Sequence, residues 1–166
     1  LLTVLSGTTG FSQQSIAAST LTTASVADSN WHHYAVTVKS ASAGVTTKFY
    51  VDGELNNESS LGTAGINNTD FSNLRAYIGA LIASPSGSSA TAGAGKLSGS
   101  VDELRYWKTQ RTSQEIGRFW FTQVGGGVNT DPTPFTTTEE SANVDLGVYF
   151  KFNEGITGKT SADSTV

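Results

Sequence analysis

Two adjacent histidines, His32 and His33, are the only ones in the chain. Imidazole is the commonest metal ligand in proteins and the usual general acid or base near neutral pH. The pair lies in residues 31–39, a stretch rich in aromatic and β-branched side chains that is typical of a strand. Successive side chains of a strand point to opposite faces, so the two rings cannot chelate one metal ion together. We therefore expect one histidine packed under a hairpin and the other at the surface.

A second pair of possible acid–base groups, Asp102 and Glu103, lies within residues 97–107. Retaining glycoside hydrolysis needs two carboxylates about 5–5.5 Å apart. Neighbouring residues of a strand face opposite ways, so these two acids do not form such a pair. Cysteine is absent, which excludes disulfides, thiol chemistry and cysteine-based zinc sites. These observations favour a non-catalytic protein.

Aromatic side chains are the remaining groups that could hold a ligand. Most of them lie in strand or helix patterns and are expected in the core: Trp31, Tyr34, Phe49, Trp107, Trp120 and Phe150. A platform for a sugar needs an exposed ring. Alternation along the strands makes Tyr50, Tyr77 and Tyr106 the candidate ligand-binding residues.

The amino-acid composition indicates the fold class of the protein that carries these side chains. Of 166 residues, 23 are Thr, 21 Ser and 18 Gly, and only 14% are charged. A coiled coil or helix bundle would instead be rich in Ala, Glu, Lys and Leu. Because Val, Phe, Tyr and Trp recur along the whole chain, outright disorder is not expected. The sequence predicts a β-rich protein with many turns, comprising one domain or one domain and part of a second.

Charge and hydropathy exclude two kinds of partner. The net charge is −4 and no cluster of Lys or Arg occurs, whereas a duplex-binding protein needs a basic face. No apolar run approaches the ~20 residues of a membrane span. We expect neither nucleic acid nor membrane as a partner. The chain begins at Leu1 without a methionine, and we expect it to be a fragment of a longer protein.

Strand patterns and turn dipeptides predict the following elements. Short strands are expected around Leu2 and Val4 and between Ile16 and Val26. Residues 31–39 and 46–51 form a hairpin that ends at the turn Asp52-Gly53. Further strands are expected at residues 74–82, 97–107 and 146–152, with a Ser/Ala/Gly/Pro-rich loop at residues 83–95.

One short helix is expected at residues 113–120. Thr112 and Glu115 have the spacing of a capping box, in which each side chain bonds the other residue's backbone amide. Ile116, Phe119 and Trp120 fall on one side of this helix. Many antiparallel strands with one small helix indicate a β-sandwich.

Three stretches, in order, resemble the laminin G-like and pentraxin-like domains of the concanavalin A-like lectin/glucanase superfamily. They are residues 31–37 with the hairpin partner 48–53, residues 99–107 with 111–116, and residues 146–155 with Gly158, Asp163 and Ser164 beyond. The resemblance covers about residues 25–166. It implies an all-β fold, an antiparallel jelly-roll sandwich of two curved sheets with one short helix at residues 113–120.

The resemblance also implies a set of domain boundaries. Residues 1–124 would form the sandwich, apparently without its N-terminal opening strand, and residues 125–145 a Gly/Pro/Thr-rich linker or long loop. In the family, a strand ending in Asn-Glu-Gly usually opens a module. Residues 146–166 therefore either complete this sandwich or open the next repeat.

In several relatives an acid of the closing strand is a structural Ca²⁺ ligand. By this resemblance Asp102, with help from Asn153 and Glu154, could hold one structural Ca²⁺ ion, which takes six to eight oxygen ligands. The alternative is that Asp102 pairs with Arg105 or caps backbone amides. Related glucanases carry a Glu-x-Asp-x-x-Glu strand whose outer acids are missing here, which disfavours a glycoside hydrolase.

The function implied is a non-catalytic glycan- or protein-recognition module in a larger extracellular or virion-surface protein. A bacteriophage virion and a bacterial surface are the two settings considered, with a glycan, a surface protein or neighbouring repeats as partners. The alternative is a purely structural spacer or decoration domain in such an assembly.

Overall fold

The computed structural model describes residues 1–6, 9–62, 65–66, 78, 97, 99–122, 124 and 145–152. The chain forms two compact units, residues 1–68 with 105–149 and residues 69–104 with 150–166. Nearly all the elements below belong to the first unit. Seven strands and two short helices occur in the described part, so the prediction of a mainly antiparallel β protein is confirmed.

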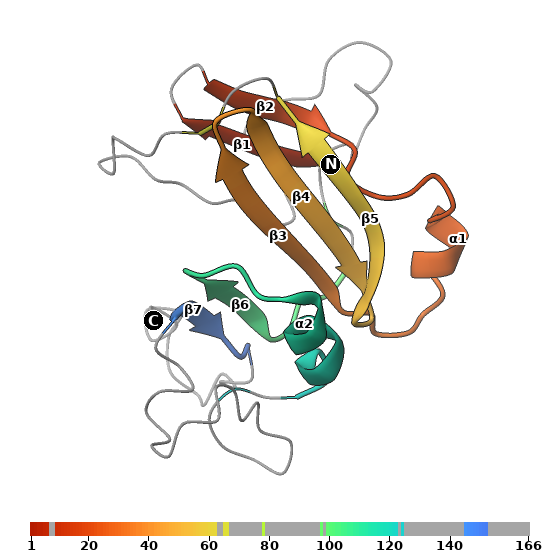
Figure 1. Ribbon diagram of the computed structural model, residues 1–166. Helices are drawn as coiled ribbons and strands as arrows, with labels where there is room; N and C mark the ends of the chain where they lie inside the picture. The colour runs from red at the N-terminus through yellow and green to blue at the C-terminus, as the bar shows by residue number, and fades with distance from the viewer. Residues whose placement is uncertain are drawn as a thin grey trace, which may run out of the picture. The chain divides into compact units, whose positions relative to one another are not determined.

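The central feature of the first unit is a three-stranded antiparallel sheet (Figure 1). Its strands are β3 (Tyr34–Ala41), β4 (Gly44–Val51) and β5 (Glu54–Leu61), with β4 in the middle. The predicted hairpin is thus confirmed, although its first strand begins at Tyr34 rather than at residue 31. The turn at Asp52-Gly53 is also confirmed, and both residues have the positive φ angles, 50° and 82°, that a tight hairpin turn requires.

The middle strand forms the core of this sheet. Val45, Thr47 and Tyr50 are each 1% exposed. A bulge opposite Phe49 and Tyr50 shifts the register of β5, and a bulge can redirect side chains. At the bulge, Asn56 Oδ1 accepts from the Ala18 amide at 2.8 Å and Asn57 Nδ2 donates to the Ile16 carbonyl at 3.0 Å. These two amides fasten the chain that follows the first hairpin to β5.

That first hairpin consists of β1 (Leu2–Ser6) and β2 (Thr9–Gln14), which pair antiparallel. β2 was not predicted; short strands were expected around Leu2 and Val4, where β1 lies, and between Ile16 and Val26. The second expectation is wrong, since this segment contains instead the four-residue helix α1 (Thr23–Val26). Its N-cap Thr22 and Ser25 form a capping box, so local hydrogen bonds to small polar side chains favour a helical turn here.

The predicted helix is confirmed as α2 (Ser113–Phe119). Its capping box is present, with the Thr112 amide donating to Glu115 Oε2 at 2.7 Å and the Glu115 amide to Thr112 Oγ1 at 3.2 Å. Ile116 and Phe119 are its buried residues. The helix is therefore anchored by two of the three apolar residues expected on one side, and the third, Trp120, is its partly exposed C-cap.

The last pair of strands is β6 (Leu104–Trp107) with β7 (Leu146–Phe150). The strand predicted at residues 97–107 is thus shorter, because residues 101–103 are not strand and Glu103 has a positive φ of 53°. The strand predicted at residues 74–82 (except Ile78), the loop at 83–95 and nearly all of the linker at 125–145 lie outside the described residues. None of the helices in the described part is long and apolar enough to cross a membrane.

The Trp120 ring leaves no room for a side chain at Gly53 of the β4–β5 turn. A Cβ placed on it would lie 2.2 Å from Trp120 Cδ1, and its φ of 82° is unfavourable for any other residue. We expect Gly53→Ala to lower the free energy of unfolding by roughly 2–4 kcal/mol, measured by urea denaturation.

Gly99→Ala is the matched control, because a Cβ there has no neighbour within 4 Å. Its expected change is within about 0.5 kcal/mol. Equal stability of the Gly53→Ala protein and the control would contradict the close packing of Trp120 on this turn.

Candidate functional site

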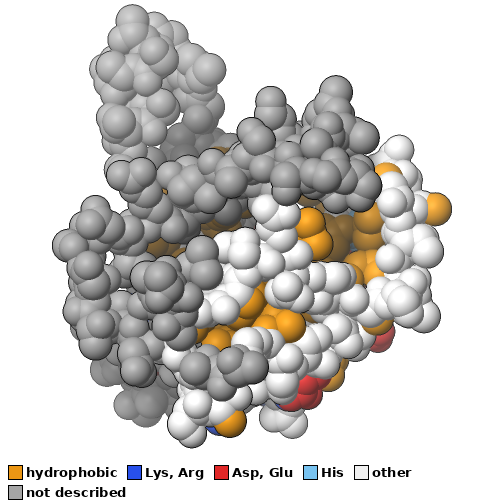
Figure 2. Space-filling model, turned by 90° about the horizontal axis from the view of Figure 1, so that it is seen from above, with side chains coloured by type: hydrophobic (Ala, Val, Ile, Leu, Met, Phe, Trp, Pro, Cys, Tyr) orange, Lys and Arg blue, Asp and Glu red, His pale blue; other side chains and the backbone are white. Residues whose placement is uncertain are grey.

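An exposed apolar surface follows one face of β3. Tyr34, Val36 and Val38 are 48%, 41% and 40% exposed, and they share a face because they alternate along the strand. We call these three residues the β3 strip. Just before it, Trp31 is 71% exposed. In the space-filling view of Figure 2, which shows one face of the molecule, hydrophobic side chains are visible at the surface among white atoms of the backbone and of uncharged side chains.

The aromatic members of this surface were expected in the core, and for Trp31 and Tyr34 that expectation is wrong. Tyr34 lies at the sheet edge with its ring parallel to that of Phe49, at a centroid distance of 6.1 Å and an interplanar angle of 1°. Trp31 precedes the strand and so has no neighbouring strand to cover it. Exposed aromatic rings of this kind are enriched where proteins bind partners.

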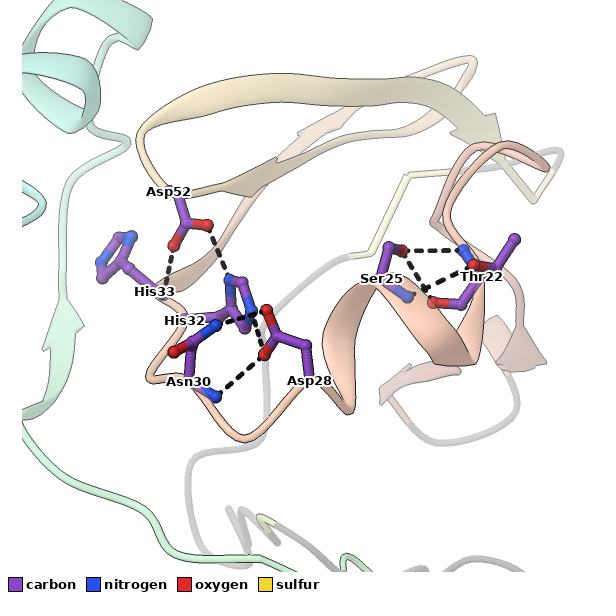
Figure 3. A network of polar contacts seen from close by, with 7 residues as sticks. All are labelled: Thr22, Ser25, Asp28, Asn30, His32, His33 and Asp52. Atoms are coloured by element: carbon purple, nitrogen blue, oxygen red, sulfur yellow. Dashed lines mark hydrogen bonds and ion pairs between the residues drawn. The ribbon is translucent and has the colours of Figure 1, made fainter.

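The segment leading into β3 is fixed by Asp52 of the β4–β5 turn (Figure 3). Asp52 Oδ1 accepts from the His33 amide at 2.8 Å, and the Asp52 amide donates to the His33 carbonyl at 2.8 Å. Its other oxygen, Oδ2, lies 2.7 Å from His32 Nδ1. One carboxylate therefore holds two consecutive residues at the base of the exposed surface.

His32 lies between two carboxylates. Its Nε2 is 3.1 Å from Asp28 Oδ1, and Asp28 also accepts from the Asn30 amide at 2.9 Å and from Asn30 Nδ2 at 2.7 Å. Both ring nitrogens can donate only when the imidazole is protonated. The Asp28–His32–Asp52 network is therefore satisfied best as an imidazolium between two carboxylates.

The pKa values of these groups shift in the directions that this geometry requires. Hydrogen bonds to Asp52 and then to Asp28 raise the pKa of His32. Hydrogen bonds from Asn30 and His32 lower the pKa of Asp28 to about 2. Burial by itself would raise the pKa of Asp52, but hydrogen bonds from His32 and His33 outweigh burial and lower it.

His33 has the opposite environment. Its ring lies 6.1 Å from that of Trp120, and its Nδ1 is buried with no hydrogen-bond partner in the part of the chain that the structure describes. Burial, and then the charge of Arg105, lowers its pKa. One histidine was expected at the surface, but the His32 side chain is only 16% exposed. Both rings are thus engaged by the fold, His32 with carboxylates and His33 by packing.

The structure separates the three predicted sugar-contacting tyrosines. Tyr50 is 1% exposed, so the prediction of an exposed Tyr50 ring is wrong, because it lies on the middle strand under the segment that enters α2. Tyr106 of β6 is 62% exposed and keeps the exposure that a platform needs. Tyr77 lies outside the described residues.

Of the proposed metal ligands, only Asp102 is described. Its side chain is exposed, and Oδ1 accepts from the Glu103 amide at 2.9 Å, which is the amide-capping role considered as an alternative. Asn153 and Glu154 lie outside the described residues. Within the described ranges, no three His, Asp or Glu side chains form a group that could hold a metal ion.

The two histidines are expected to give opposite pH dependences of stability. His32 has a raised pKa, so its contribution is complete below its ordinary value of 6.5 and is lost as the pH rises through the folded-state pKa. His33 has a lowered pKa, so protonation below 6.5 costs stability. Asp28 contributes above 3.8 and its contribution is lost as the pH falls towards 2.

We therefore compare how the free energy of unfolding changes between pH 5 and 8 in each protein. The wild type loses the contribution of His32 as the pH rises and His32→Gln does not, so the variant should gain stability relative to the wild type over this range. The free energy of unfolding of His33→Gln should instead decrease relative to that of the wild type over the same range. Urea denaturation at four pH values measures both slopes. Identical slopes in all three proteins would show that neither histidine titrates differently in the folded state.

Comparison with known proteins identifies the family. A laminin G-like family model, described as the concanavalin A-like lectin/glucanases superfamily, matches residues 3–117. No curated protein and no solved structure matches significantly. The matched segment contains the β3–β4–β5 sheet, β6 and most of α2. Domains of this type are generally binding or adhesion modules, usually extracellular and typically non-catalytic, although the superfamily includes glycosidases. The antiparallel strands and the family match together support the jelly-roll sandwich, and the chain belongs to the concanavalin A-like lectin/glucanase superfamily as a laminin G-like domain.

Proposed function

We propose that this domain is a non-catalytic recognition module that binds glycans or other proteins. The observation that carries the proposal is the exposed pair Trp31 and Tyr34, 71% and 48% open to solvent, at the end of the β3 strip. Tyr and Trp offer a large apolar face together with a polar atom, at a low cost in conformational entropy. The Asp28–His32–Asp52 network adds rigidity, since it fixes the backbone between the two rings.

The sequence of the closing strand disfavours a glycoside hydrolase. In the segment that resembles the catalytic strand of the glucanases, Ser100 and Arg105 stand where the outer acids would flank Asp102. Asp102 is exposed and caps the Glu103 amide. A retaining mechanism needs two carboxylates facing one substrate bond, and this segment supplies one.

The proposed setting is a larger surface-exposed protein, extracellular or on a virion. The low charge content and the many Ser, Thr and Gly residues suit such a setting. We further propose that β7 belongs to this domain rather than to a following repeat, because it pairs with β6.

A glycan array with the purified chain tests the recognition function. We expect saturable binding to one class of glycan, and a loss of about tenfold or more in affinity for Trp31→Ala, because aromatic anchors dominate such contacts. Phe121→Ala is the matched control, as Phe121 is also exposed, at 59%. If both variants bind like the wild type, the surface around Trp31 is not the contact. A blank array from folded protein would favour the structural spacer.

A structural Ca²⁺ ion held by Asp102, Asn153 and Glu154 remains our proposal for the closing strand. An ion that binds only the folded state, at a hundredfold excess over its Kd, stabilises by about 2.7 kcal/mol. Melting curves should therefore shift to lower temperature when EDTA is added, and Asp102→Asn should abolish the shift. Superimposable curves with and without chelator would contradict the calcium site.

A further inference from the structure

A cavity of about 270 Å³ opens beside the middle strand of the sheet. Lys48 and Tyr50 of β4 form one side, and residues 110–113, which lead into α2, form the other. In the β3–β4 register, Thr37 pairs with Lys48 and Val36 with Phe49. The cavity therefore lies on the face of the sheet opposite the β3 strip.

Hydroxyl and amide groups line this cavity. The Tyr50 hydroxyl lies 2.8 Å from Ser113 Oγ, and Gln110 Nε2 donates to Thr37 Oγ1 at 3.3 Å. Each hydroxyl can both donate and accept a hydrogen bond. Such groups are held in place here, because the Tyr50 ring is buried and the Ser113 backbone is fixed in the first turn of α2.

The two cations of the cavity are already balanced by acids. Lys48 Nζ is 3.2 Å from Glu58 Oε2, and Arg111 Nη1 is 3.6 Å from Glu115 Oε1. The Arg111 guanidinium also lies over the Trp107 ring, 4.2 Å from its centroid, which fixes its orientation. Lys48 and Arg111 thus give the cavity N–H donors, and their charges are balanced by Glu58 and Glu115, which are not among its lining residues.

We propose that this cavity binds one neutral pyranose residue of a glycan. Its volume is below the ~300–1,000 Å³ typical of pockets for drug-sized ligands, so it suits a single ring. Sugar hydroxyls donate and accept at once, which matches a lining of paired donors and acceptors. An anionic sugar would have to compete with Glu58 and Glu115 for the same cations. The inference rests on the proposed glycan recognition and adds to it a second contact, on the face of the sheet opposite the β3 strip.

Nuclear magnetic resonance titration of the ¹⁵N-labelled full chain tests the proposal. The probes are the methyl glycosides of glucose, galactose, mannose and N-acetylglucosamine, with glucuronate tested separately. We expect one neutral glycoside to shift the resonances of residues 110–113 saturably. Lys48→Ala and Gln110→Ala should each weaken this binding about tenfold, the loss of one hydrogen bond to the ligand. Lys39→Ala on β3, outside the cavity, is the matched control and should bind like the wild type.

The outcomes separate this inference from the proposed function. Shifts around Trp31 and Tyr34 that survive Lys48→Ala and Gln110→Ala would overturn the cavity site and keep glycan recognition. Binding of glucuronate alone would overturn the neutral class of ligand. A positive glycan array without any shift at residues 110–113 would overturn the cavity while the recognition function stands. Blank results in both experiments, from folded protein, would overturn glycan binding at both surfaces.

Discussion

The carboxylate of Asp52 is the constraint on which the local architecture depends. It extends the β3–β4 ladder beyond the pair Tyr34–Val51, because Asp52 and His33 exchange hydrogen bonds through backbone and side chain. The same group holds His32 and, through it, Asp28. A loop of exposed polar residues would otherwise sample many conformations, and ordering each residue costs about 1–2 kcal/mol. The Asp28–His32–Asp52 network instead holds the backbone next to Trp31 in one conformation.

The sequence predicted those helices, turns and hairpins whose hydrogen bonds join residues close together in the chain. The capping box of Thr112 and Glu115, the Asp52-Gly53 turn and the β3–β4 hairpin are all determined by residues close together in the chain. β5 was not predicted, because Leu55 and Leu61 are its only apolar residues. Its stability comes from pairing with β4 and from Asn56 and Asn57, which bind the chain near Ile16. Hydrogen bonds between residues some 40 positions apart produce no alternating pattern of apolar residues from which β5 could have been predicted.

The candidate site was harder to predict. The alternation of side chains along a strand assigns residues to the two faces of the sheet, but it does not tell which face the rest of the chain covers. Thr37 is 6% exposed whereas Val36 is 41% exposed, so the more hydrophobic of the two side chains is the one in contact with solvent. The cause is the segment before α2, where Gln110 bonds Thr37 and Ser113 bonds Tyr50. That segment covers the face that carries Thr37 and Tyr50. On the opposite face Val36 and Val38 of the edge strand stay exposed, although Val45 and Thr47 of β4 are buried there. Tyr50 was therefore assigned to the surface and Tyr34 to the core, and in the structure each has the other's environment.

This inversion has a consequence for binding. At the β3 edge of the sheet, one face exposes aromatic and aliphatic side chains to solvent. The other face carries the hydroxyl-lined cavity. Both combine β-strand residues with a short connecting segment that side-chain hydrogen bonds hold in place, so little conformational entropy is lost when a ligand binds. Because β4 contributes Phe49 to one face and Lys48 and Tyr50 to the other, the strand would support two contacts that do not compete for the same atoms. Two weak contacts on one rigid domain can act together when the glycan or the parent protein presents several copies, since the second contact is then made at a high effective concentration.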